Sequence, residues 1–168
     1  GGTASESDWT LTATGPTSIS GVGAAGSADV VSGASFDAGV YTLSESSGPS
    51  GYTASGWTCS NGDNDGTISV ALGDDITCSI TNDDIQPKLT LIKHVVTDNG
   101  GNALVSDFPL FVSGSPVASG IQNVFNAGIY SASETTLSGY TPSVWSGDCA
   151  ADGSITLSPG DEKTCHIT

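Results

Sequence analysis

Gly39-Val-Tyr-Thr-Leu-Ser-Glu45, followed by Gly51-Tyr-Thr-Ala-Ser-Gly-Trp57-Thr-Cys59, sets the architecture of this chain, because the chain contains it twice. The second copy reads Gly128-Ile-Tyr-Ser-Ala-Ser-Glu134 and then Gly139-Tyr-Thr-Pro-Ser-Val-Trp145-Ser-Gly-Asp-Cys149. Each copy ends in a Gly-Asp-acidic-x-Thr-Cys segment. A repeat of this length indicates two similar domains in tandem, and we place them at residues 1–84 and 85–168.

The composition favours short strands and disfavours several classes of function. The 168 residues carry 18 acidic side chains against three basic ones, for a formal net charge of −15. This charge repels phosphate backbones and anionic membrane surfaces, so we expect no nucleic-acid partner. No apolar run reaches the roughly 20 residues of a membrane span, so we expect no membrane insertion.

Alternation of apolar and polar residues predicts an all-β fold. Trp9–Thr14, Thr67–Leu72 and Ile76–Ile80 alternate with period two, and clusters of Gly, Asn and Asp separate such segments. No segment repeats apolar residues at helical spacing, so we predict no helix longer than a turn. Many short strands at this spacing predict two immunoglobulin-like antiparallel β-sandwiches.

Four cysteines, two in each copy, predict one disulfide per domain. We expect Cys59 to pair with Cys78 and Cys149 with Cys165, each bond contributing about 3 kcal/mol. A zinc site is the alternative, but the short Cys-x-x-Cys spacing is missing and the chain has only two histidines. Disulfides place the protein in an oxidising compartment, and hence outside the cell or on its surface.

Large aromatic residues recur at matched positions of the two copies. We expect them to fill the two cores beside the disulfides, while an exposed row of the same residues would instead make a platform for a glycan. The set is Trp57, Trp145, Tyr41, Tyr130, Tyr52 and Tyr140.

Two loops have alternative interpretations. Asn61-Gly-Asp-Asn-Asp-Gly66 resembles the start of a calcium loop, but Leu72 stands where the bidentate Glu is required, so we predict a hairpin turn without metal. The glycine-rich insertion at residues 21–26 predicts a mobile loop, or else a surface that a partner approaches closely. No Ser/His/Asp or Cys/His arrangement is present, so we expect neither catalysis nor a cofactor.

The two copies differ at their ends. The second copy contains a strand at residues 88–96 ahead of the shared pattern, and the first copy has no counterpart, because Gly1 aligns with Gly100. We therefore expect the first domain to be completed either by more of the same polypeptide or by a strand from a neighbouring subunit. An unpaired sheet edge is a template for such a strand.

One set of residues resembles a known family. Leu89-Thr-Leu-Ile-Lys93, the Gly-x-Tyr segments ending in Glu45 and Glu134, and Ile80-Thr-Asn82 resemble the collagen-adhesin B-type and prealbumin-like repeats of bacterial pilins and surface adhesins. The resemblance implies two prealbumin-like β-sandwiches. It also implies an isopeptide bond in which a Lys of the first strand joins an Asn of the last strand with the help of a Glu.

The resemblance places the isopeptide groups unequally. The second domain offers Lys93 and Glu134, and the first domain offers Glu45 and Asn82, so neither contains all three groups. The opposing interpretation is that Lys93 is an exposed charge on an edge strand. We expect a structural repeat of an extracellular filament, pilus or stalk, with copies of itself as partners. The alternative is an adhesin that binds host matrix or glycans.

Overall fold

The structure, a computed structural model, describes residues 1–24 and 26–168 and contains two compact units. The first domain is Thr3–Asp84, and the second domain is Ile85–Thr168 together with Gly1 and Gly2. Both consist of strands and short 3-10 turns. In the part of the chain that the structure describes, no helix is long and apolar enough to cross a bilayer.

The described residues of the first domain form eight strands and two 3-10 turns. They are η1 (Glu6–Asp8), β1 (Thr10–Thr14), β2 (Ile19–Val22), η2 (Ala28–Val30), β3 (Gly39–Glu45), β4 (Tyr52–Ala54), β5 (Thr58–Cys59), β6 (Thr67–Val70), β7 (Cys78–Ser79) and β8 (Asn82–Asp84).

The second domain also contains eight strands, with one 3-10 turn. They are β9 (Lys88–Lys93), η3 (Val105–Asp107), β10 (Leu110–Val112), β11 (Ser115–Val117), β12 (Gln122–Val124), β13 (Gly128–Glu134), β14 (Ser146–Gly147), β15 (Ser154–Leu157) and β16 (Glu162–Ile167).

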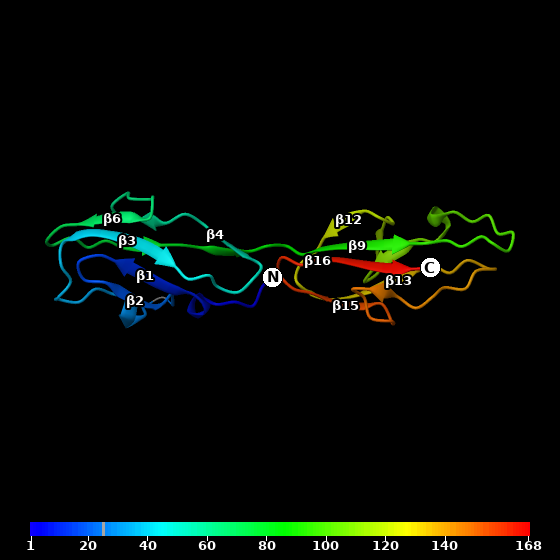
Figure 1. Cartoon of the computed structure of the whole chain (residues 1–168), viewed down its shortest axis with the longest axis horizontal. Coiled ribbons are helices and arrows are strands. Elements are labelled where there is room, and N and C mark those ends of the chain that lie inside the picture. Colours follow the sequence, from blue (N-terminus) through cyan, green and yellow to red (C-terminus); the bar gives the residue numbers. More distant parts are fainter. Residues whose placement is uncertain (25) are drawn as a thin grey trace. The chain divides into compact units, whose positions relative to one another are not determined.

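Two four-stranded sheets make the second domain a sandwich. One has the order β11-β10-β13-β15 and the other β12-β9-β16-β14. β9 lies inside its sheet, with β12 on one side and β16 on the other. β9 and β16 run side by side in the same direction (Figure 1), in a register from Lys88 opposite Glu162 to Lys93 opposite Ile167.

This parallel pair differs from the antiparallel sandwich that the sequence predicts. Short hairpin connections force antiparallel pairing, but β9 and β16 are the first and last strands of the domain and no hairpin joins them. Their relative direction is therefore set by packing. The other strand pairs of the described chain are antiparallel.

The first domain repeats one sheet of the sandwich and only part of the other. Its four-stranded sheet β2-β1-β3-β6 corresponds to β11-β10-β13-β15 of the second domain. The opposite layer consists of two separate pairs, β4 with β8 and β5 with β7. No strand of the described first domain takes the place that β9 has in the second.

The two cores differ accordingly. In the second domain the inward residues of β9, β10, β13, β15 and β16 form one buried cluster around the disulfide. In the first domain the buried cluster contains Tyr41, Cys59 and Ile68, with other apolar residues only partly covered. The Cys59–Cys78 and Cys149–Cys165 disulfides are both present and no described cysteine is free, which confirms the predicted pairing.

Backbone conformation explains why the Gly-Tyr dipeptide occurs in both copies. Gly51 has φ 84° and Gly139 has φ 88°, a left-handed conformation that residues with a Cβ rarely adopt. Each glycine thus turns the chain just before Tyr52 or Tyr140. Both copies need glycine at this position for the same turn.

The loop at residues 61–66 differs from its prediction. Residues 61–66 join β5 to β6, which pair with β7 and β3 respectively, so the segment crosses between sheets and is not the predicted hairpin turn. Its polar side chains bond within the turn, as when Asn61 Nδ2 donates to Asp63 Oδ2 at 2.7 Å. In the glycine-rich insertion, Gly21 and Val22 end β2, and residue 25 lies outside the described residues.

Candidate functional site

Lys93 occupies a buried position because of strand alternation. In β9 the odd-numbered residues Leu89, Leu91 and Lys93 are buried, whereas the even-numbered ones are partly exposed. Period two therefore turns the last residue of the strand into the sandwich whatever its charge. Lys93 is not the exposed edge-strand charge of the opposing interpretation, since β9 lies between β12 and β16.

Glu134 is the counter-ion of Lys93. It ends β13 in the facing sheet, and the Lys93 and Glu134 side chains are only 3% and 5% exposed. Lys93 Nζ lies 2.8 Å from Oε2, the nearer oxygen, while the better-directed hydrogen bond goes to Oε1 at 3.2 Å. Two opposite charges with so little solvent exposure stabilise each other strongly, and burying either charge alone would cost free energy.

Aromatic rings surround the pair. Lys93 Nζ lies 4.5 Å from the centroid of the Phe108 ring, a cation–π distance. Tyr140 packs edge-on against Phe108 at 5.3 Å, and its hydroxyl accepts a hydrogen bond from the Ala103 amide at 3.0 Å. The rings thus hold the ammonium group in place and shield it from water.

A cavity of about 420 Å³ adjoins this ion pair. Its lining includes Lys93, Glu134, Phe108 and Tyr140, with Thr168 beside them. Thr168 corresponds to Thr81 of the first domain, and Asn82 follows Thr81. An amide side chain that reacts with Lys93 would have to reach the Lys93 ammonium group beside this cavity.

The first domain contains the corresponding second half of the set. Asn82 Nδ2 donates to Glu45 Oε1 at 2.7 Å, and both residues are half-buried. Trp9 takes the place of Phe108, with Tyr52 edge-on against it at 5.4 Å. The Tyr52 hydroxyl accepts from the Ala4 amide at 3.1 Å, as that of Tyr140 does from Ala103.

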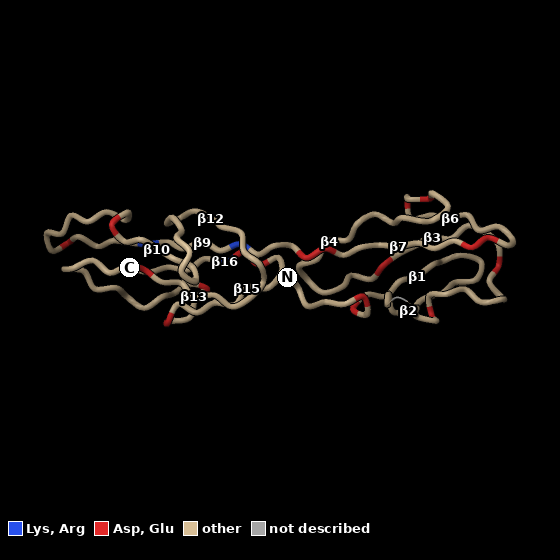
Figure 2. Tube along the Cα trace, turned by 180° about the vertical axis from the view of Figure 1, so that it is seen from behind, with Lys and Arg blue, Asp and Glu red and all other residues tan. Residues whose placement is uncertain are grey.

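The structure thus brings the predicted isopeptide groups together in two incomplete sets. Lys93 meets Glu134 in the second domain, and Glu45 meets Asn82 in the first. Lys93 and Asn82 belong to different domains. Figure 2 shows the underlying imbalance: acidic residues lie along both domains, but all the lysines are in the second.

Of the predicted core aromatics, Tyr41 and Trp145 belong to the two buried clusters and Tyr130 packs against one of them, whereas Trp57, Tyr52 and Tyr140 are in neither cluster. Tyr41 and Trp145 are buried, and the other four are half-buried. The Tyr41 hydroxyl donates to the Asp37 carbonyl at 2.7 Å, and that of Tyr130 donates to the Asn126 carbonyl at 2.9 Å. In both domains the tyrosine hydroxyl therefore bonds to the backbone carbonyl of the residue four positions earlier in the chain.

Sequence reasoning missed two features of the site. It did not assign Trp9 and Phe108 to the surroundings of the charged groups, although the two align with each other in the repeat. It also did not predict that His94, which follows β9, lies beside His166 of β16, with His94 Nε2 3.3 Å from His166 Nδ1. Nothing in the repeat indicates this contact, because the first copy contains no histidine.

Comparison with known proteins identifies the family. The model of the prealbumin-like fold domain matches the chain twice, at residues 1–80 and 84–167. The chain therefore belongs to this family, as two tandem prealbumin-like β-sandwiches. No curated protein and no solved structure matches the chain.

Proposed function

We propose that this chain is a structural repeat unit of an extracellular filament, pilus or cell-surface stalk. The observation that carries the proposal is the repeated arrangement of the two domains: each contains one disulfide and one tyrosine packed edge-on against an equivalent aromatic ring, Tyr52 on Trp9 and Tyr140 on Phe108. The prealbumin-like domain is of the pilus and surface-protein type and is typically not enzymatic. Domains of such arrays contact mainly their neighbours along the chain.

Location outside the cell is part of the proposal. Each small domain is closed by a disulfide, and disulfides persist in oxidising compartments. A disulfide also compensates for a small core, which is most limited in the first domain. Both features suit a protein that works without the protection of the cell interior.

Assembly end to end, with strands exchanged between copies, is the finer part of the proposal. Its support is the first domain, whose second layer is split into two strand pairs and whose core is only partly covered. A strand from a neighbouring repeat would cover that core and bond to the free sheet edge.

We also propose an isopeptide bond at the Lys93–Glu134 site. After Lys93 Nζ transfers a proton to the Glu134 carboxylate, it would attack the Cγ of an Asn side chain, forming the Nζ–Cγ bond while the Cγ–Nδ2 bond breaks and ammonia leaves. A protonated Glu134 would polarise the amide carbonyl and transfer protons. Mass spectrometry of the protein isolated from its source tests this: loss of one ammonia and absence of free Lys93 are expected, and an uncrosslinked Lys93 would contradict it.

Electron microscopy of cells that produce the protein tests the main proposal. Immunogold labelling with antibodies against the 168-residue chain is expected to mark thin appendages or the cell surface. Pre-immune serum is the control. Labelling confined to the cell interior would contradict the proposal.

A glycan-binding platform has less support. It requires an exposed row of aromatic rings, but Tyr41 and Trp145 are buried and the remaining matched aromatics are partly covered by packing. We therefore propose no second function.

A further inference from the structure

β9 defines what the incomplete second layer of the first domain lacks. In the second domain Leu89 and Leu91 are each 1% exposed and pack between the two sheets. Lys88 and Lys93 mark the two ends of the same strand and both bind carboxylates. The strand thus contributes two apolar side chains to the core and a positive charge at each end.

The residues that pack with β9 in the second-domain core have counterparts in the first domain that are less buried. Strand register matches Leu11 with Leu110, Leu43 with Ala132 and Val70 with Leu157, and the cysteines match Ile80 with Ile167. The four second-domain residues are at most 3% exposed. The four first-domain residues are only half-buried.

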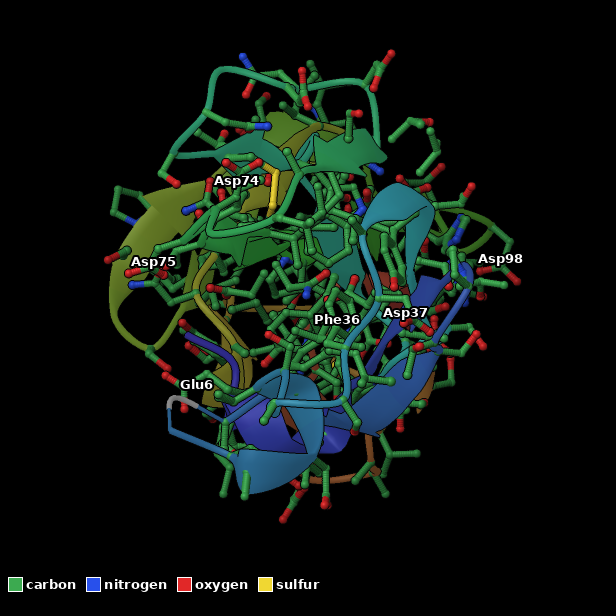
Figure 3. All side chains as sticks on the ribbon, turned by 90° about the vertical axis from the view of Figure 1, so that its left-hand side faces the viewer. Glu6, Phe36, Asp37, Asp74, Asp75 and Asp98 are labelled. Atoms are coloured by element: carbon green, nitrogen blue, oxygen red, sulfur yellow. A yellow bond between two sulfur atoms is a disulfide. The ribbon has the colours of Figure 1, made fainter. Side chains whose placement is uncertain are left out.

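These half-buried residues line an open groove of about 730 Å³. We call it the strand-binding groove: it lies between the sheet β2-β1-β3-β6 and residues 73–80. Its apolar lining includes the side chains of the sheet together with Phe36 and Ile76. The acidic residues Glu6, Asp74 and Asp75 also line it. In the end-on view of Figure 3, Phe36 lies toward the middle and these three acids lie nearer the outside.

The backbone along this groove is available for pairing. β7 pairs with β5 and with no other strand of the described chain. The Ser60 amide donates to the Thr77 carbonyl at 2.9 Å, so the next pair, Cys59 with Cys78, does not exchange backbone bonds. The Cys78 N–H and C=O consequently point away from β5, in the direction in which Cys165 faces β9 in the second domain.

The charges of the groove match those around β9. Asp75 is the counterpart of Glu162, which binds Lys88 at 2.7 Å, and Glu45 is the counterpart of Glu134, which binds Lys93. Residues 1–84 contain no Lys, Arg or His, so the first domain supplies no cation to either carboxylate. Trp9 stands where Phe108 contacts the Lys93 ammonium in the second domain, and tryptophan is the strongest cation–π partner.

We propose that the strand-binding groove receives a β-strand of a neighbouring repeat with the pattern Lys-apolar-x-apolar-x-Lys, parallel to β7. Its apolar side chains take the places that Leu89 and Leu91 have in the second domain. Its first lysine binds Asp75 and its last binds Glu45, beside Trp9. This inference rests on the proposed assembly of repeats and names the partner of that contact.

Binding of a synthetic peptide to the full 168-residue chain tests the proposal. The probe is a fluorescently labelled peptide with the sequence of residues 88–97, followed by anisotropy. Saturable binding is expected, together with slower hydrogen exchange of the amides of residues 76–80. The same peptide with Leu91→Asp or Lys93→Gln is expected to bind at least about tenfold more weakly, because each change leaves a desolvated group without its partner.

Two variants of the chain locate the binding site. Glu45→Gln is expected to weaken binding about tenfold by removing the buried counter-charge. Asp75→Asn, at an exposed position, gives a smaller loss and keeps the test valid if the first variant folds poorly. Glu162→Gln is the matched control: it removes one charge at the equivalent place in the second domain and leaves peptide affinity unchanged.

The outcomes separate this inference from the proposed function. Absence of peptide binding by a folded, monomeric chain overturns the inference, as does equal binding of the Leu91→Asp peptide. If the chain associates with itself through the groove, the peptide dissociates the complex, which supports the inference. Surface labelling without peptide binding would contradict the inference and still support the structural role. Peptide binding without surface labelling would support the strand-binding groove and contradict the proposed function.

Discussion

The burial of the Lys93–Glu134 ion pair determines how much each of its residues contributes to stability. The pair is almost fully buried, so its energy depends on both partners being present. Replacing a whole buried pair by apolar residues is often tolerated, but removing one partner leaves an uncompensated charge. The exposed pair Lys88–Glu162 has the same chemistry without that dependence.

This contrast predicts the effect of removing one lysine. Lys93→Ala is expected to lower the free energy of unfolding of the second domain by about 3 kcal/mol. Lys88→Ala, the control, should lower it by no more than about 0.5 kcal/mol. Urea titration with hydrogen exchange of the β9 and β16 amides measures both, and equal effects of the two changes would contradict the prediction.

Asp161 predicts a pH dependence. The Ser158 amide donates to its carboxylate at 2.7 Å and Lys163 lies 3.1 Å away, so the pKa of Asp161 is lowered, mainly by the Ser158 bond. A lowered pKa stabilises the folded state above the ordinary carboxyl pKa of about 3.9, and this stability is lost as pH falls through the folded value.

The expected result is a difference between wild type and Asp161→Asn that depends on pH. At pH 7 the variant should be less stable by about 1 kcal/mol, from the weakened charged hydrogen bond. The difference should shrink as the pH falls below about 4. Thermal melts across this range measure it, with Asp98→Asn as control, and a difference that persists at low pH would show that the charge is not responsible.

At the scale of the element, the two domains differ because the second contains β9 and the described part of the first has no equivalent strand. Residues 163–167 of β16 pair with β9, and Cys165 and His166 also pair with β14, whereas β7 pairs on one side only in the described chain. Paired and buried amides open less often than amides at a free edge. The two equivalent segments should therefore differ in protection.

Hydrogen exchange measures that difference directly. Amides of residues 76–80 in the isolated chain are expected to exchange at least about tenfold faster than those of residues 163–167. The comparison is internal, because both segments belong to one molecule. Equal protection would mean that the edge of β7 is covered in solution.

At the scale of the whole molecule, the two disulfides should differ in importance. A disulfide contributes about 3 kcal/mol to each domain, but the first domain has the smaller buried core to support it. The double change Cys59→Ser with Cys78→Ser is expected to unfold the first domain near room temperature. Cys149→Ser with Cys165→Ser should leave the second domain folded but less stable. Circular dichroism and limited proteolysis test this, and equal loss in both variants would contradict it.

The sequence by itself determined the repeat, the all-β class and the two disulfides. These follow from local patterns: period two, left-handed glycines such as Gly51, and cysteines paired within each copy. A reader of the sequence could also align Trp9 with Phe108, but not assign either ring to a charged partner.

Only the tertiary structure decided the rest. The parallel pairing of β9 with β16, the burial of Lys93 against Glu134 and the open groove over Leu43 all depend on contacts between distant segments. Alternation states that Lys93 shares a face with Leu91, but the same pattern would fit an edge strand with that face in water. Which face is covered depends on the facing sheet, and no local property of the chain specifies it.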